Sequence, residues 1–435
     1  MIKYKFMTLK KTFKYSLSLL LIIFFLYLYD FYIFDNSTNL QFWCVEINTL
    51  QQNIKLPFHC DEGPYRFASQ SIENFFNLAN PYQGRPLFVF VLSFFRYVFS
   101  IFSFLNISEY QIFRLSFVFI QILILICIVF EFAKLVNLKF DKSIDYLLIF
   151  LLLSIPSIRW NIFLSSVGNI PFLLFLLILN NLLKNNSESK ESNKLFIILG
   201  IFSLAHLSAI LYGLIFLLLS FFKEKKISLY VIFVNLSYLI IFQIIYRIVI
   251  YFSNYEFYDW HRDVYNQFYW IIDSIKGIPT TKCQSWSTFL LCNYEVTKSY
   301  IGYFAILFIF VILLLFILKL QNKKTLKLIN LSFKVNILVF LFWSLQGIYE
   351  PFRFVNYSIG YFLFLSLIIF VIEFQFNPYL LFSFLSYTLS IPYLEPYNSA
   401  LNTPQINIMT IFSIISFLLF LINELRVSLS EINKK

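Results

Sequence analysis

Charged residues, glycine and proline are all scarce in this 435-residue sequence. Only 13% of the residues are charged, against about 25% in an ordinary soluble protein. Glycine occurs 9 times and proline 12 times, which excludes collagen-like, linker-like and low-complexity chains. In contrast, 59% of the residues are hydrophobic, and a soluble protein of this length could not bury that apolar surface. The composition therefore indicates an integral membrane protein.

The apolar residues form continuous runs, and this decides between helices and a β-barrel. The run 301–318, for example, does not alternate with polar residues and approaches the ~20 residues that a membrane-crossing helix needs. We therefore predict an all-α, polytopic helical membrane protein, one integral membrane domain over residues 1–435 with about 11 to 13 membrane segments. The segments are expected near residues 15–34, 86–105, 113–136, 144–158, 163–183, 195–222, 227–252, 300–318, 335–345, 354–372, 379–391 and 406–425.

Two polar stretches are predicted to be extracytoplasmic loops, residues 35–84 and 253–299. Lysines precede the first apolar run and cluster again at 319–334, and Lys434 and Lys435 end the chain, so both termini are expected in the cytoplasm. The net charge of +11 is interpreted as positive-inside anchoring, because Lys and Arg are scattered rather than gathered in one stripe. We expect no nucleic-acid partner, contact with membrane lipids, and a bacterial inner membrane location.

The topology between residues 86 and 226 has two solutions. If every run crosses once, the lysines of this region lie outside, against the positive-inside rule. If 86–108 and 195–222 are each a shallow hairpin, these lysines lie inside. The lysines concerned are Lys134, Lys139, Lys142, Lys184, Lys190 and Lys194.

Four of the five cysteines fall in the predicted external loops. Cysteine pairs on an oxidising side favour disulfides, and the most local of the three possible pairings joins Cys44 to Cys60 and Cys283 to Cys292. A zinc site is the alternative, but the spacings and nearby histidines typical of such sites are missing.

The densest polar segment, residues 59–66, contains the adjacent carboxylates Asp61 and Glu62. A carboxylate just outside the membrane can act as a general base, and a nearby arginine can hold a phosphate with two parallel hydrogen bonds. The alternative is structural: the carboxylates cap a following helix, and Arg66 and Arg85 reach toward lipid phosphates. This segment contains the motif Asp61-Glu62-x-x-Tyr65-Arg66. A second motif, Gln83-Gly84-Arg85-Pro86-Leu87, follows where the next apolar run begins.

This pair of motifs, separated by an amphipathic stretch, resembles the first extracytoplasmic loop of GT-C-fold glycosyltransferases. The resemblance implies a polytopic enzyme that uses a polyprenyl-phosphate-linked sugar, with an acidic base in this loop. Asp61 is then the first candidate base, Glu62 the second and Asp35 the third. Arg66, Arg85 or Arg353 would then lie near the carrier phosphate, and Tyr65 is a further substrate-binding candidate. For Arg353, at a membrane edge beside Glu350, reaching toward lipid phosphates is the alternative.

Weaker similarity follows at residues 113–115, at Pro156, at 199–206 and at 350–354, as a pattern rather than a motif. The stretch around His206 also resembles exopolysaccharide and O-antigen polymerases, which act on the same class of lipid-linked sugar. His206 falls near the middle of the predicted segment 195–222, where it could face a lipid-phosphate pocket or bond a neighbouring carbonyl. Arg96, Glu131 and Arg247 are further ionisable residues in apolar runs.

The second external loop contains Asp259-Trp260-His261-Arg262-Asp263, whose two aspartates share a face if the segment is helical. Asp259, His261 and Arg262 could bind a divalent cation or a sugar phosphate, and a solvated loop helix is the alternative. No cofactor other than such a cation is implied, and no metal site is assigned.

Several nucleotide, metal and nucleophile motifs are missing. The sequence has no Walker loop, GxGxxG, HExxH or GxSxG pattern. The resemblance to GT-C glycosyltransferases implies a membrane glycosyltransferase of cell-envelope glycan synthesis, which transfers a sugar from a polyprenyl-phosphate carrier to an extracytoplasmic acceptor. The alternatives are a lipid-linked polysaccharide polymerase and, in a different class, a lipid or solute transporter or flippase.

Overall fold

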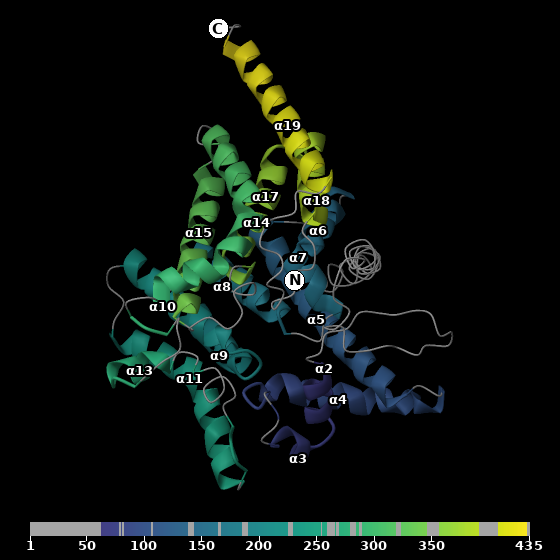
Figure 1. Cartoon of the computed structure of the whole chain (residues 1–435), viewed down its shortest axis with the longest axis vertical. Helices are drawn as coiled ribbons and strands as arrows, with labels where there is room; N and C mark the ends of the chain where they lie inside the picture. The colour runs from purple at the N-terminus through teal and green to yellow at the C-terminus, as the bar shows by residue number, and fades with distance from the viewer. Residues whose placement is uncertain are drawn as a thin grey trace.

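The computed structural model describes most of the chain after residue 61 as helices (Figure 1). All regular elements of that part are helical, which confirms the all-α prediction for it. The described residues are 62–77, 80, 82–105, 108–137, 143–163, 167–184, 190–224, 229–253, 255–258, 266, 269–278, 284–286, 289–318, 323–345, 356–390 and 408–432. The predicted first segment, 15–34, lies outside them.

Among the described residues, four helical stretches are long and apolar enough to cross a membrane: Pro86–Phe104, Glu109–Val136, Leu229–Phe252 and Thr325–Ser344. These stretches fit an integral membrane protein. The elements are α2 (Glu62–Ala68), α3 (Ile72–Phe75), α4 (Pro86–Ser100), η3 (Ile101–Leu105), α5 (Glu109–Val136), α6 (Ser143–Ser154), α7 (Pro156–Phe163), α8 (Asn169–Lys184), α9 (Lys190–Ser203), α10 (Ser208–Glu224), α11 (Leu229–Phe252), α13 (Trp270–Ile275), α14 (Phe289–Leu318), α15 (Lys323–Ser344), η4 (Asn356–Gly360), α17 (Tyr361–Glu373), α18 (Pro378–Ser390) and α19 (Ile408–Ile432).

Several helix boundaries differ from the predicted segments. The run 195–222 is two helices, α9 and α10, which fold back on each other so that the rings of Phe196 and Phe216 are 5.6 Å apart, as the hairpin solution for this run expects. Helix α14 begins at Phe289, inside the predicted loop 253–299. Helix α15 begins at Lys323, twelve residues before the predicted segment 335–345. The reason is physical: hydropathy locates apolar surface, whereas a helix continues through polar residues wherever its backbone hydrogen bonds continue.

Helix α4 lies across α5 rather than along it, as Figure 1 shows. The ring of Phe88 is 5.5 Å from that of Phe117, and three turns later the ring of Phe99 is 5.6 Å from that of Phe119. A long stretch of α4 thus meets a short stretch of α5. The first turn of α4 also bonds to the connection between α9 and α10, because the Leu87 N–H donates to the Leu204 carbonyl at 3.0 Å. Residues 86–105 form one helical stretch, α4 followed directly by η3, and not the hairpin that the second solution expects at 86–108.

Helices α5 and α8 run parallel and side by side. The Asn169 amide donates to Gln121 at 3.2 Å, and eleven residues later the Asn180 amide donates to the Glu131 carbonyl at 2.8 Å. Both helices therefore end at the same end of the bundle, opposite the start of α5.

Lysines mark this second end of the bundle. Lys134 and Lys184 lie in the last turns of α5 and α8. We call the end of the bundle that contains the last turns of α5 and α8 the lysine end. If residues 35–84 are external, the lysine end is cytoplasmic, in agreement with the positive-inside rule.

The centre of the bundle is formed by α17, whose side chains from Tyr361 to Val371 are all buried. Helix α8 is also mostly buried, whereas α11 exposes most of its apolar side chains. Helices α18 and α19 pair as a hairpin, in which the Ser383 hydroxyl donates to the Ser413 carbonyl at 2.9 Å. Beyond this contact α19 extends away from the bundle (Figure 1).

Candidate functional site

Residues 62–85, which we call the cap, fold as two short helices against α4 and the start of α5. Ser71 caps α3, and its hydroxyl accepts a hydrogen bond from the Asn74 N–H at 3.1 Å. The pKa of the exposed Glu73 carboxylate lies below its usual value, because the carboxylate accepts hydrogen bonds from its own backbone N–H and from Ser71. The cap is thus a folded helical unit at the end of the bundle opposite the lysine end.

One side of the cap, the Arg85 side, is built from stacked aromatic rings and a guanidinium. The rings of Tyr65 and Tyr82 lie 3.7 Å apart with only 5° between their planes. The Arg85 guanidinium lies 5.1 Å from the centroid of the Tyr82 ring and donates a hydrogen bond to the Tyr65 hydroxyl. Tyr65 is fully buried and Arg85 is half-buried, so a cation is held at the cap surface by an aromatic floor.

Gln83 ties the Arg85 side to a distant part of the chain. Its carbonyl accepts a hydrogen bond from the Tyr246 hydroxyl at 2.6 Å, and its side-chain oxygen accepts one from the Tyr258 N–H at 2.9 Å. The end of α11 is therefore fixed against the cap.

His206 lies in the turn between α9 and α10, not in the middle of one helix as predicted. Its ring Nδ1 is 2.8 Å from the Ser208 hydroxyl and accepts a hydrogen bond from the Ser208 N–H at 3.2 Å. The same turn includes Leu204, whose carbonyl bonds to the first turn of α4, directly after Arg85. The half-buried imidazole thus lies at the cap end of the bundle.

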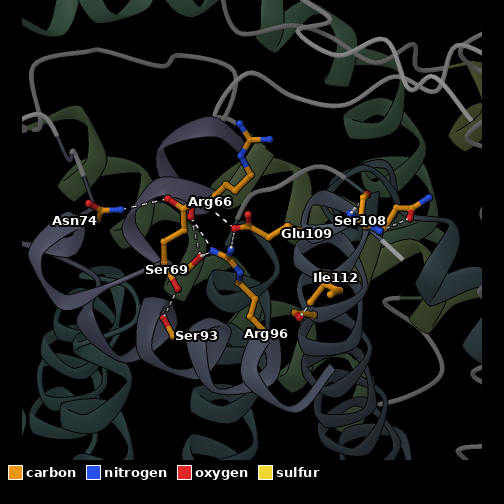
Figure 2. Close-up of polar contacts among 11 residues, drawn as sticks. Arg66, Ser69, Asn74, Ser93, Arg96, Ser108, Glu109 and Ile112 are labelled. Carbon is orange, nitrogen blue, oxygen red and sulfur yellow. Dashed lines mark hydrogen bonds and ion pairs between the residues drawn. The ribbon is translucent and has the colours of Figure 1, made fainter. Parts of the chain in front are cut away.

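The other side of the cap, the Arg96 side, is a network around one buried guanidinium (Figure 2). Arg96 donates to the Arg66 carbonyl at 2.8 Å, to the Ser69 hydroxyl at 2.6 Å and to the Glu109 carboxylate at 2.6 Å. Gln70 donates to the same carboxylate at 3.0 Å. The network joins the end of α2 to α4 and to the first turn of α5. In it the Arg66 carbonyl, near the C-terminal end of α2, accepts a hydrogen bond from the Arg96 guanidinium.

Two further arginines flank a tyrosine on the Arg96 side. The Arg66 guanidinium is 5.4 Å and the Arg114 guanidinium 4.6 Å from the centroid of the Tyr110 ring. Figure 2 shows the Arg66 side chain extending away from Arg96. The described charged side chains at this position are three arginines and Glu109, so the Arg96 side suits an anionic group.

A second polar cluster, which we call the tyrosine layer, is buried between α7, α8, α10 and α17. Tyr361 donates to the Gly168 carbonyl at 3.3 Å, and the Tyr357 hydroxyl and the Asn161 amide oxygen lie where a side chain on Gly168 would begin. The layer comprises Ser157, Asn161, Gly168, Asn169, Tyr212, Tyr357 and Tyr361.

The predicted site residues have three outcomes. The structure brings Tyr65, Arg66, Arg85 and His206 to one end of the bundle. Glu62 begins α2, and Cys292 lies in the first turn of α14, with only their backbones described. The other predicted residues lie outside the described residues: Asp35, Cys44, Cys60, Asp61, Asp259, His261, Arg262, Cys283 and Arg353.

The other ionisable residues of the apolar runs are engaged by neighbours. Glu131 forms an ion pair with Lys134 and accepts a hydrogen bond from Asn180 at 2.8 Å. The Arg247 guanidinium lies 3.2 Å from the centroid of the Phe257 ring. Over the described residues, no three His, Cys, Asp or Glu side chains come close enough together to hold a metal ion.

Sequence reasoning missed Glu109 and Gly168. Glu109 follows Ser108, which forms a capping box with Gln111, and that motif predicts a helix start at the membrane edge. Gly168 is one of only 9 glycines and stands before an asparagine in an apolar region, which is a signal of close packing. Comparisons with protein-family models, with curated proteins and with solved structures give no match to this chain.

Proposed function

We propose that this chain is an integral membrane glycosyltransferase that transfers a sugar from a polyprenyl-phosphate carrier to an acceptor at the cap end. The observation that carries the proposal is that polar side chains from separate parts of the sequence meet at one end of the bundle. Tyr65, which lies in the helix that begins at Glu62, shares one end of the bundle with Arg85 and with the distant His206. Such convergence of polar groups at the end of an apolar bundle is typical of a site for an amphipathic substrate.

The Arg85 side has the chemistry needed for a phosphate leaving group. A guanidinium can bind phosphate oxygens with two parallel hydrogen bonds and stabilise the charge that develops on them. In the proposed reaction the acceptor oxygen forms a bond to the anomeric carbon, and the bond from that carbon to the carrier phosphate breaks. The acceptor proton passes to a carboxylate, and polyprenyl phosphate leaves. Asp61 is the first candidate for that carboxylate, with Glu62 and Asp35 after it.

The test is transfer of radiolabelled sugar from native membrane lipid extract by the purified chain. We expect Asp61→Asn to lower the transfer rate about 100-fold, because the general base is lost. Glu62→Gln and Asp35→Asn test the other carboxylates, and Arg85→Gln tests the phosphate contact. Glu73→Gln is the matched control, because it removes an exposed carboxylate from the same cap.

Insertion and expression of each variant are matched before rates are compared. Loss of transfer in one carboxylate variant, with Glu73→Gln active, identifies the base. The proposal is wrong if the wild-type chain transfers nothing from several lipid-linked donors. The first-loop assignment is wrong if the wild-type chain is active and all three carboxylate variants match it.

A transporter or flippase is the second candidate, and one observation favours it. Transport sites typically form where interrupted helices place polar groups inside the bundle, and the tyrosine layer lies at the break between α7 and α8. Substrate-coupled or ion-coupled flux in liposomes, without sugar transfer, would favour this function. Flux that is unchanged in a Gly168→Ala variant would argue against a role of the layer.

A further inference from the structure

Three polar atoms of the tyrosine layer are buried, and none has a hydrogen-bond partner among the described residues. They are the Tyr212 hydroxyl, the Asn169 amide oxygen and the Ser157 hydroxyl. Tyr212 and Asn169 are 0% exposed and Ser157 is 1% exposed, so bulk solvent does not reach them. Leaving such a group unsatisfied costs about 1–3 kcal/mol, and the cost grows in an apolar surrounding.

The three atoms belong to one region of the fold. Asn169 follows Gly168, whose carbonyl accepts the Tyr361 hydroxyl. Ser157 lies one turn before Asn161 on α7, and Asn161 donates to the Ser157 carbonyl while its own oxygen faces Gly168. Tyr212 is close enough to Tyr357 and Tyr361 to interact with them electrostatically. The unsatisfied atoms therefore belong to three helices, α7, α8 and α10, that contribute to the tyrosine layer around Gly168.

The chemistry of these atoms selects the ligand. The Tyr212 and Ser157 hydroxyls can donate or accept a hydrogen bond, and the Asn169 amide oxygen can accept one. A small neutral molecule that both donates and accepts hydrogen bonds, such as water, matches these groups. A buried water needs two to four polar partners, whereas empty internal spaces are normally lined by apolar side chains. Metal cations prefer carboxylate ligands, and none of the residues of the layer is an Asp or Glu.

We propose that the tyrosine layer is a binding site for internal water, held by Tyr212, Asn169 and Ser157 beside Gly168. The bound water completes the hydrogen bonding of an interrupted helix pair inside an apolar bundle. This site is independent of the proposed sugar transfer, because none of its residues belongs to the cap. It also accounts for the polar residues that α7, α8 and α10 contribute to an interior made mostly of Phe, Leu and Ile.

The test is X-ray radiolytic footprinting of the full chain in lipid nanodiscs, read by mass spectrometry. Radiolysis of a bound water makes hydroxyl radicals in place, so we expect Tyr212 and Tyr361 to be modified at least ten times faster than Tyr387. Tyr387 is the control residue, because it is only 2% exposed but lies in α18, outside the layer. Equal rates for the three tyrosines would show that the layer is dry and overturn the proposal.

Two variants test whether the water is bound rather than diffusing in. Ser157→Ala removes one water partner with little change of shape, and Asn169→Leu removes another. Each is expected to lower the modification of Tyr212 at least threefold. Ser332→Ala is the matched control, because it removes a buried hydroxyl without a described partner from α15, and it should leave the rate unchanged.

Radicals made in bulk solvent by peroxide photolysis provide the last comparison. They should leave Tyr212 unmodified, because the site is closed to bulk water. Modification of Tyr212 by bulk radicals, or rates that Ser157→Ala and Asn169→Leu both leave unchanged, would overturn the proposal.

Discussion

The Arg96 side of the cap and the tyrosine layer are both polar clusters in an apolar bundle, and they are built from different chemistry. The Arg96 side contains charges, and its carboxylate is at the surface: the Glu109 side chain is 66% exposed, while that of Arg96 is 9% exposed. The tyrosine layer is buried and contains only neutral hydroxyls and amides. The difference follows from solvation, because a buried charge costs far more than a buried neutral dipole.

A second difference concerns what each cluster holds together. Arg96 joins α2, α4 and α5 through side-chain bonds to one guanidinium. The tyrosine layer joins helices through close backbone approach at Gly168, where even a Cβ atom would contact Tyr357 and Asn161. We therefore expect the layer to be sensitive to added volume and the Arg96 side to be sensitive to lost hydrogen bonds.

The largest effect is expected for Gly168→Val. The new side chain must displace the Tyr357 hydroxyl and the Asn161 amide, and overpacking of this kind costs about 3 kcal/mol. Unfolding of the purified chain by denaturant in mixed micelles measures the loss. Gly63→Ala is the matched control, because nothing lies within 4 Å of the Cβ added there. Equal stability of the two variants would contradict the close packing at Gly168.

An intermediate effect is expected for Arg96→Met. The variant keeps much of the apolar stem but loses hydrogen bonds to Arg66, Ser69 and Glu109. Bonds of a charged donor contribute about 1.5–3 kcal/mol, and exposure of Glu109 reduces this to about 1–2 kcal/mol.

The measurement for Arg96→Met is limited proteolysis of the cap together with denaturant unfolding. Cleavage in residues 62–77 should become faster, because α2 loses its contact with α4 and α5. Arg66→Gln is the matched control, since it removes an exposed guanidinium from the same network and keeps the Arg66 carbonyl. If Arg66→Gln exposes the cap as much as Arg96→Met does, net charge rather than the network stabilises it.

The smallest effect distinguishes two tyrosines of the layer. Tyr361→Phe removes a hydroxyl that donates to the Gly168 carbonyl and should cost about 1 kcal/mol. Tyr212→Phe removes a hydroxyl whose proposed partner is an internal water, and it should cost less because that water keeps its other partners. Paired unfolding curves at matched lipid content measure the difference. A larger loss for Tyr212→Phe would contradict this order and show that the Tyr212 hydroxyl contributes more than the bond from Tyr361 to Gly168.

Part of the candidate site could be predicted from the sequence. Arg66, Arg85 and Tyr65 were found because short polar motifs beside an apolar run are visible as local pattern. The sequence left open whether the run 195–222 crosses once or turns back, because residues 204–207, where His206 lies, contain no glycine or proline to mark the turn. The pairing of Arg96 with Glu109 depends on how α4 crosses α5, and the local sequence pattern carries no information about that crossing.

The sequence by itself determined that this chain is helical and apolar enough to cross a membrane, because composition and continuous apolar runs depend only on residue order. Only the tertiary structure decided that α4 lies across α5, that Lys134 and Lys184 share one end, and that Gly168 is enclosed by tyrosines. The physical reason is that an apolar side chain is satisfied equally by lipid and by another helix. Which neighbour it meets is set by shape and by the few polar groups that require partners.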